Sequence, residues 1–418
     1  MTLRVRIPGR SAATLVLAML AAPAAAHADV VLDWNAIAVR TMSAQNPFAQ
    51  ARLLAITQLA VFEAVNAVDG GFEPYLGTVQ AAPDASAGAA AIAAAHGVLV
   101  KYFPGSAAAL DADRATWLAA IPDGPPKTAG IAAGEAAAAA MIAAREGDGS
   151  APPQFYLPGS ALAGEWQLTP ACMPAGGAFY HWGHVAPFGI PSAEAFILGP
   201  PPDLTSNQYA KDYADVKRLG GMNSTERPQD RADVARFYAS ISPSALSSEA
   251  LRQLAAGRGN SLAENARALA LVAMSISDSL VVSFATKYHY NFWRPETAIR
   301  AGDSDGNRKT EPDPGFVPFI ATPCFPSYPS NHASGTNGGL EVLRRLYGAA
   351  GHSLTLTNPV LGVTRHYTSL EQISDNVDDA RVYGGIHFWF DQEGGNRLGR
   401  TIATYVYKNN LRAIGGAR

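Results

Sequence analysis

The sequence predicts an all-α protein made of helical bundles, with a long irregular segment near residues 148–205. Three observations predict this class. Apolar residues recur at helical spacing through several long stretches, alanine fills many of them, and no series of alternating, strand-like segments stands out. Because small side chains let helices pack closely, the alanine runs indicate a packed bundle.

The first 28 residues have the pattern of a secretory signal peptide. Three arginines precede an apolar run over residues 12–22, and Ala26 and Ala28 supply the small residues of a cleavage site. The run is too short to stay in a membrane as a spanning helix. We therefore expect an exported protein, periplasmic or extracellular, whose mature chain begins at Asp29.

The helical pattern then continues to the C-terminus. We expect helices over residues 51–69, 86–103, 127–146, 206–218, 228–241, 262–286, 332–348, 368–391 and 393–408. The helix over 262–286 is apolar enough to suggest a membrane span, but Glu264, Arg267 and Asp278 interrupt it, so we expect a buried bundle helix. Residues 148–205 are rich in Pro, Gly and aromatic side chains, which favours an ordered loop.

Composition excludes some classes of function. The formal net charge is −3, and no basic stripe is present, so we expect no nucleic-acid partner. His181 and His184 have the spacing of a zinc pair, but no third ligand is evident nearby. The two cysteines, Cys172 and Cys324, could pair in an oxidising compartment, and the sequence leaves this pairing open. Nothing decides between a monomer and a larger assembly.

The first motif with chemical meaning contains two cations among aromatic residues, in the stretch KYHYNFWRP. Pro295 disfavours helical geometry at Arg294, so we expect the helix to end near Lys287 and Arg294 to lie just past it. The planar fork of arginine suits a tetrahedral oxyanion, and lysine adds a point charge. The alternative is a structural cation–π contact.

The second motif is PSNH, residues 329–332. Ser330 or Asn331 is placed to cap a helix of small residues, and His332 lies in its first turn. The free N–H groups at a helix N-terminus form a natural site for anions. Taken alone, the stretch could equally be an ordinary N-cap.

The third motif contains Arg381, His387 and Asp391. If the segment is helical, His387 and Asp391 lie one turn apart on one face. The carboxylate can then accept the Nδ1 proton, which leaves Nε2 free as a ligand or nucleophile. The alternative is a histidine that is satisfied inside the core.

In this order, the motifs Lys-x6-Arg-Pro, Pro-Ser-x-His and Arg-x5-His-x3-Asp resemble the signature of the vanadium-dependent haloperoxidase and type 2 phosphatidic acid phosphatase superfamily. The resemblance covers residues 287–391. The flanking stretches FWRPETAIR and YGGIHFWFD are similar to the soluble bacterial haloperoxidase branch. Ala380 stands where the phosphatase signature commonly has Ser, which also favours the peroxidase branch.

The resemblance implies an oxyanion site. Lys287, Arg294 and Arg381 would bind the oxygens of vanadate or phosphate, and three cations can offset a trianion. Ser330 and the N–H of Asn331 would add hydrogen bonds. The family usually has Gly at position 331, so the Asn331 side chain must point away from the oxyanion or bond to it.

The resemblance also implies the groups that act on the bound ion. His387 would ligate vanadium in a peroxidase or attack phosphorus in a phosphatase, with Asp391 orienting its ring. His332 would be the acid–base group. The aromatic residues on the halide side of chloroperoxidase-like members align best with Phe284 and Phe325, whose alternative role is core packing.

These implications lead to one preferred function and two alternatives. The preferred one is a haloperoxidase with vanadate as cofactor, which uses hydrogen peroxide to oxidise halide to hypohalous acid for a small organic acceptor. The first alternative is an exported acid phosphatase with no cofactor and a phosphohistidine intermediate. The second is a scaffold without enzymatic activity. We place the site in a helical domain over residues 206–418, which follows an N-terminal helical region over 29–205.

Overall fold

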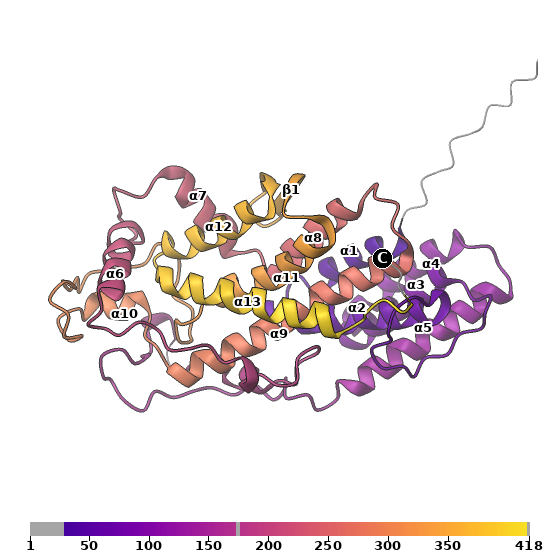
Figure 1. Ribbon diagram of the computed structural model, residues 1–418, viewed down its shortest axis with the longest axis horizontal. Helices are drawn as coiled ribbons and strands as arrows, with labels where there is room; N and C mark the ends of the chain where they lie inside the picture. The colour runs from indigo at the N-terminus through magenta and orange to yellow at the C-terminus, as the bar shows by residue number, and fades with distance from the viewer. Residues whose placement is uncertain (1–28, 173–175, 416–418) are drawn as a thin grey trace, which may run out of the picture.

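The computed structural model describes residues 29–172 and 176–415, so the expected signal peptide lies outside the described residues. Helices dominate an elongated molecule, with α3, α4 and α5 at one end and α6 and α10 at the other (Figure 1). This confirms the all-α class. The α-helices are α1 (Val30–Thr41), α2 (Pro47–Asp69), α3 (Ala87–Tyr102), α4 (Ala107–Ala119), α5 (Pro125–Ala144), α6 (Asn207–Leu219), α7 (Gln229–Ala239), α8 (Pro243–Ala255), α9 (Leu262–Tyr290), α10 (Pro295–Arg300), α11 (Asn331–Tyr347), α12 (Leu370–Val382) and α13 (Trp389–Asn409).

Small residues hold the N-terminal bundle together. A Cβ added at Gly130 or Gly134 of α5 would lie 2.3 Å from the carbonyl oxygen of Ser86 or Ala90, at the start of α3. Only glycine permits such an approach between helices. The close packing expected from the alanine-rich runs is therefore present between α3 and α5.

The central helix of the molecule is α9, 29 residues long, which packs against α2, α11 and α13. A capping box of Ser261 and Glu264 begins it, and Asn291, in the left-handed conformation, ends it. Both α2 and α9 are long and apolar enough to cross a membrane, but 83% and 94% of their most apolar stretches are buried inside the protein. They serve here as core helices.

Glycines also bring α13 close to α11, the helix that follows the second motif. A Cβ at Gly395 would lie 2.5 Å from Ser330 O, and one at Gly399 would lie 2.2 Å from Ser334 O. On the other side of α11, a Cβ at Gly338 would lie 2.8 Å from Ser275 O of α9. The tight contacts between α9, α11 and α13 fix the relative positions of the second and third motifs.

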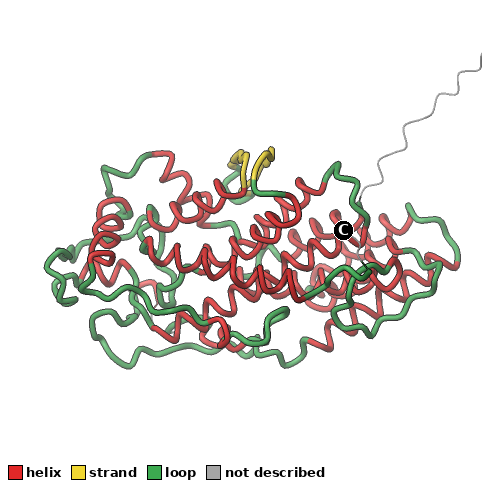
Figure 2. Tube along the Cα trace, viewed as in Figure 1, coloured by secondary structure: helices red, strands yellow, loops and turns green. Residues whose placement is uncertain are grey.

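Two sequence expectations are wrong in this region. The single helix expected over 368–391 is two helices, because the chain turns between Val382 and Trp389. Gly385 has φ +78°, and a Cβ there would lie 2.2 Å from Gly220 O, so the helix cannot continue. A small antiparallel hairpin, β1 (Ala350–Asn358) and β2 (Val363–Ser369), was also not expected (Figure 2).

In the described residues 148–172 and 176–205, the long segment before α6 is loop with short 3-10 turns (Figure 2). One turn, Tyr180–His184, packs against α9. The N–H of Trp166 donates to Asn291 O at the end of α9, at 2.7 Å. The proposed division at residue 205 stays a prediction.

Candidate active site

The predicted site residues lie at or near the ends of helices and in the segments that join them. Lys287 lies in the last turn of α9, and Arg294, with extended backbone, precedes α10. Residues 323–330 lead into α11. Arg381 lies in the last turn of α12, and His387 directly precedes the cap of α13. Hydrogen bonds and charge interactions join these segments in one buried cluster.

The His387 imidazole is held between a carboxylate and a guanidinium. Its Nδ1 lies 2.9 Å from Asp391 Oδ2, and its Nε2 lies 3.0 Å from Arg294 Nη1. A guanidinium nitrogen can only donate, so Nε2 accepts and Nδ1 carries the proton that Asp391 accepts. Ser327 Oγ and the Phe388 N–H donate to the same carboxylate oxygen, at 2.6 and 3.0 Å. The ring is neutral, with a lone pair on Nε2.

The expected contact between His387 and Asp391 is therefore present, but its expected cause is wrong. The two residues do not lie on one helix. His387 comes before α13, and Asp391 lies in the first turn of that helix. A carboxylate near a helix N-terminus accepts main-chain N–H groups, which fixes Asp391 before it orients the ring.

Arg294 and Arg381 carry buried guanidinium groups whose hydrogen bonds are incomplete. Arg294 donates to Phe325 O and Ile386 O, at 2.8 and 2.9 Å, but its Nη2 has no partner among the described residues. Nε and Nη2 of Arg381 also lack a partner within the described chain. Burying an unpaired cation is costly. These donors therefore fit an anion with several oxygens, such as vanadate or phosphate.

The Lys287 ammonium contacts main-chain carbonyl oxygens of the segment before α11. Its ammonium donates to three carbonyl oxygens, those of Pro326, Ser327 and Pro329, at 2.9, 2.7 and 2.5 Å. All three N–H groups are thus used on the segment before α11. Burial, followed by the charge of Arg294, lowers the pKa of Lys287 well below its usual value. Direct contact of Lys287 with an oxyanion stays a prediction.

The second motif forms the start of α11, as expected. Ser330 is the N-cap and accepts from the Ala333 N–H at 3.3 Å, while its own N–H donates to Asp391 O at 2.9 Å. Asn331 is the first residue of the helix, where main-chain N–H groups have no intrahelical acceptor. His332 Nε2 lies 3.0 Å from Ile241 O.

Burial governs the protonation of the cluster. Burial and nearby positive charges, first of all Arg294, lower the pKa of His387 well below its usual value. Burial, then the charge of Arg381, lowers the pKa of His332 to about 3. Burial raises the pKa of Asp391 to about 6 and lowers those of Arg294 and Arg381 to about 9 and about 10. A bound anion would oppose these shifts at both histidines, since negative charge favours protonation.

A known protein family matches the part of the sequence that forms this cluster. The VCPO second helical-bundle domain matches residues 267–416, the stretch that contains every predicted site residue. This stretch of the chain is therefore similar to a domain of the vanadium haloperoxidases. Over 184 residues it is 28% identical to the vanadium chloroperoxidase of Curvularia inaequalis. That match covers 36% of this chain and 30% of the length of the relative.

Solved structures of vanadium haloperoxidases share the fold over most of the chain. A bacterial vanadium-dependent iodoperoxidase superposes with a TM-score of 0.76 at 22% identity, covering 93% of this chain and 97% of that one. Apo and holo forms of a bacterial vanadium-dependent chloroperoxidase give TM-scores of 0.69 and 0.68, each at 14% identity. They cover 86% and 88% of this chain and 92% and 93% of their own. At these identities the likeness establishes the fold.

The aromatic residues expected on the halide side of a vanadium haloperoxidase lie beside the cations. The Phe325 ring centroid is 4.9 Å from Arg294 Cζ and 5.3 Å from Lys287 Nζ. The Phe284 ring lies 5.0 Å from that of Phe325. Both phenylalanines are also buried in the core. Their position suits either of the roles considered, and a role toward halide stays a prediction.

Two residues that support the candidate site were not identified from the sequence. Ser327 links the Asp391 carboxylate to the segment held by Lys287. Asp212 of α6 accepts from the Phe390 N–H at 2.9 Å, in the first turn of α13, and burial raises its pKa to about 6. Ser327 lies two residues before the second motif, between Pro326 and Pro329, and this nearness was a usable signal. Asp212 lies far away in the sequence, and no pattern connects it to the site.

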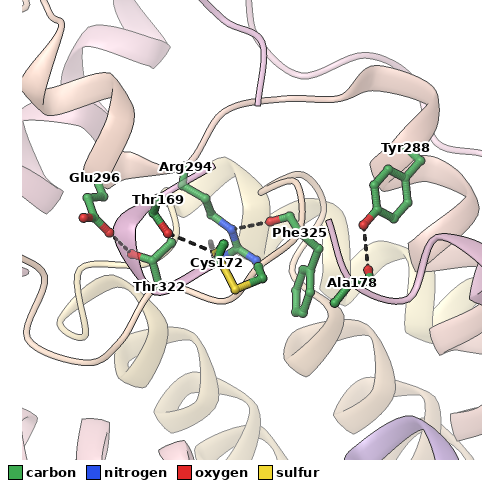
Figure 3. The surroundings of a disulfide bond; sticks show 9 residues. Thr169, Cys172, Ala178, Tyr288, Arg294, Glu296, Thr322 and Phe325 are labelled. Carbon is green, nitrogen blue, oxygen red and sulfur yellow. Dashed lines mark hydrogen bonds between the residues drawn. A yellow bond between two sulfur atoms is a disulfide. The ribbon is translucent and has the colours of Figure 1, made fainter. Parts of the chain in front are cut away.

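The question left open about the cysteines is answered by the structure. Cys172 and Cys324 form a disulfide with their Cα atoms 5.2 Å apart. Figure 3 shows the bond beside Arg294 and Phe325. It joins the long loop to the segment that leads into α11. Within the described residues, His181 and His184 belong to no group of His, Cys, Asp or Glu side chains that could hold a metal ion.

Proposed function

We propose that the protein is a vanadate-dependent haloperoxidase, which converts halide, hydrogen peroxide and a proton into hypohalous acid and water. The observation that carries the proposal is a neutral His387 whose Nε2 lone pair accepts from Arg294, together with three buried guanidinium nitrogens, Arg294 Nη2 and Arg381 Nε and Nη2, that have no partner in the described chain. A tetrahedral oxyanion with a metal centre satisfies both features, because it accepts hydrogen bonds and takes a nitrogen ligand.

The residues available to hold vanadate follow from their free atoms. Arg294 and Arg381 offer unpaired N–H groups, and the Asn331 N–H lies at a helix start. We propose that these groups, with Ser330, bind the oxygens. Lys287 would join them by exchanging one of its three carbonyl partners for an oxygen of the anion. In the bound state vanadate supplies a Lewis acid that activates peroxide without changing its own oxidation state.

The remaining roles belong to the two histidines and the carboxylate. His387 is the nitrogen ligand, and Asp391 holds its Nδ1 proton so that Nε2 keeps its lone pair. His332 is proposed as the acid–base group. With a pKa of about 3 it is neutral before substrates bind and can accept a proton. A neighbouring anion would raise this pKa toward a value at which His332 can return the proton.

The test compares two reactions on the same purified protein. One arm follows bromination of a phenolic dye in orthovanadate, hydrogen peroxide and bromide, with chloride and iodide in parallel. The other follows p-nitrophenyl phosphate hydrolysis without vanadate. We expect vanadate-dependent dye bromination that His387→Ala removes and His366→Ala, on the exposed face of β2, retains. Phosphate release without bromination would instead support the phosphatase, in which the same His387 Nε2 attacks phosphorus.

We also propose that the protein is exported. The support is the signal-peptide pattern of residues 1–28 together with the Cys172–Cys324 disulfide, a bond that persists in oxidising compartments. Fractionation of the producing cells and N-terminal sequencing of the mature chain test this. We expect the protein outside the cytoplasm, beginning at Asp29, and an uncleaved cytoplasmic chain would contradict it.

A further inference from the structure

A cavity of about 350 Å³ lies outside the cluster of site residues, between α2, the end of α3 and the long loop. Its volume falls in the range of pockets for small molecules. Tyr102, Phe155, Phe179 and Trp182 line it, with Ala49 of α2 on the opposite element. Aromatic side chains present flat apolar faces that suit flat apolar ligands.

The wall of this cavity is built on the segment that forms the site. Ala178 lines the cavity and donates its N–H to Cys324 O at 2.7 Å. Its carbonyl accepts from Tyr288 Oη at 2.6 Å (Figure 3). The Phe179 ring lies 6.4 Å from the Phe325 ring, which lies 4.9 Å from Arg294 Cζ. One phenylalanine ring therefore stands between the cavity wall and the cations of the site.

Phe179 has a backbone conformation that points to a function. Its φ and ψ are 60° and 29°, in the left-handed region, which is an outlier for a bulky side chain. Such a residue keeps this conformation only where its surroundings hold it, and these residues gather at binding sites. The Phe48 and Trp182 rings, at 4.5 and 6.5 Å, pack against the Phe179 ring and hold it on the cavity.

Arg52 and His181, the titratable side chains with nitrogen donors or acceptors in the cavity lining, already have hydrogen-bond partners in the protein, which disfavours a ligand that would need those groups. Arg52 Nε donates to Asp148 Oδ2 at 2.7 Å and its Nη2 donates to Arg145 O at 3.2 Å, so these donors are held by the protein. Arg145 shares the same carboxylate. His181 Nδ1 accepts from the Gln154 N–H at 3.1 Å. Burial lowers the pKa of His181, so its ring is neutral at physiological pH. The remaining lining is mainly aromatic or aliphatic.

We infer that this cavity binds a small, uncharged aromatic molecule that accepts the halogen. The inference rests on the proposed function for its oxidant. Hypohalous acid from the site reacts with the arene, a carbon–halogen bond forms as the oxygen–halogen bond breaks, and the displaced ring proton combines with hydroxide to give water. Atoms and electrons balance, because the halogen of hypohalous acid is the oxidant and the ring carbon is oxidised.

The first experiment measures binding alone. Titration calorimetry with 2-naphthol, without vanadate or peroxide, compares the wild type with Ala49→Phe, which fills the cavity, and Ala108→Phe, which adds the same ring on the exposed surface of α4. We expect one saturable site, weakened at least about tenfold in Ala49→Phe and unchanged in Ala108→Phe. Absent binding, or equal binding in both variants, would overturn the inference. If circular dichroism shows that Ala49→Phe is unfolded, Ser150→Leu fills the cavity from the loop instead.

The second experiment measures turnover. Iodide oxidation to triiodide needs no arene, whereas bromination of 2-naphthol does. We expect the ratio of naphthol bromination to triiodide formation to fall at least about tenfold in Ala49→Phe relative to Ala108→Phe. We expect this fall to come from a higher KM for naphthol. An unchanged ratio would contradict an acceptor role. If no halide oxidation occurs in the wild type, the proposed function fails, and the calorimetry still decides whether the cavity binds an arene.

Discussion

Arg294 Nη1 donates to His387 Nε2 at 3.0 Å, so a guanidinium group contacts the nitrogen that carries the lone pair. This is the nitrogen that would ligate vanadium or attack phosphorus. The contact keeps the imidazole neutral and directs its lone pair toward the guanidinium. A ligand that binds His387 must replace this hydrogen bond, and the unpaired Nη2 of Arg294 is then available to the same ligand. Binding of a ligand to His387 is therefore linked to the hydrogen bonds of Arg294, and variants of either side chain can test this link.

Replacement of Arg294 by lysine should weaken oxyanion binding. Lysine keeps the charge but loses the planar fork that joins Phe325 O, Ile386 O and His387 Nε2. We expect the Kd for orthovanadate to rise about 10–100-fold. Vanadium NMR of titrated protein measures it. The matched control is Arg308→Lys, at an exposed position, which should bind as the wild type does. Equal affinity in both variants would contradict the assignment.

Replacement of Asp391 by asparagine should change the proton on His387. An amide at this position can donate to Nδ1, which would move the ring proton to Nε2 and remove the lone pair. We expect kcat for halide oxidation to fall on the order of 10²–10⁴-fold. The same variant should keep most of its helical circular dichroism, because asparagine also accepts main-chain N–H groups at a helix start. Full activity would show that the tautomer of His387 does not matter.

The neutral state of His332 should appear as a pH dependence of stability. Its pKa is about 3 when folded, whereas an unfolded histidine titrates near 6.5. Between these values the unfolded chain binds more protons, so stability falls as pH falls, by up to about 1.4 kcal/mol per pH unit. His332→Phe removes this contribution. The raised pKa of Asp391 acts in the opposite direction but is present in both proteins.

Urea unfolding at several pH values between about 4 and 7 gives the difference in slope. We expect the free energy of unfolding of the wild type to fall more steeply with acid than that of His332→Phe. Parallel curves would mean that His332 titrates normally in the folded protein. The measurement needs no halide oxidation, so it tests the environment of His332 alone.

The glycine contact between α11 and α13 should be costly to fill. A methyl group at Gly395 would lie 2.5 Å from Ser330 O and 2.8 Å from Ala333 Cβ. We expect Gly395→Ala to lower the free energy of unfolding by about 1–3 kcal/mol. Gly88 of α3 is the matched control, since a Cβ there makes ordinary contacts at 3.6 Å or more. Gly88→Ala should be neutral or slightly stabilising, because alanine favours helix by about 1 kcal/mol.

Periodicity and composition were sufficient for much of the fold. The helices whose apolar spacing was regular, such as α2 and α9, lie close to where they were expected. The break after Val382 was missed because it depends on the close approach of Gly385 to Gly220, a contact between distant segments. The hairpin was not expected, although SLTLTN and VTRHYTS alternate in the way that is typical of strands. Helices α1, α4, α8 and α10 were also not anticipated.

The candidate site could be predicted as a set of residues but not as a geometry. The order of the three motifs predicted that His387, Asp391 and Arg294 share one site. In the structure His387 contacts both Asp391 and Arg294. The role of Lys287 toward main-chain carbonyls could not be foreseen, because it depends on the path of residues 326–329. The motifs in the sequence indicate which side chains form the site. Their hydrogen-bond partners depend on the path of the folded chain.

The three carbonyl bonds of Lys287 have a consequence for genetics. A substitution there would release the turn before α11 as well as remove a charge, so an inactive Lys287 variant would not by itself identify a ligand of the oxyanion. The lysine would be retained under selection for a foldable chain even in a descendant that had lost all turnover. The presence of this lysine in a related chain would therefore indicate that the turn before α11 is kept, and would not by itself indicate that the chain is an active enzyme.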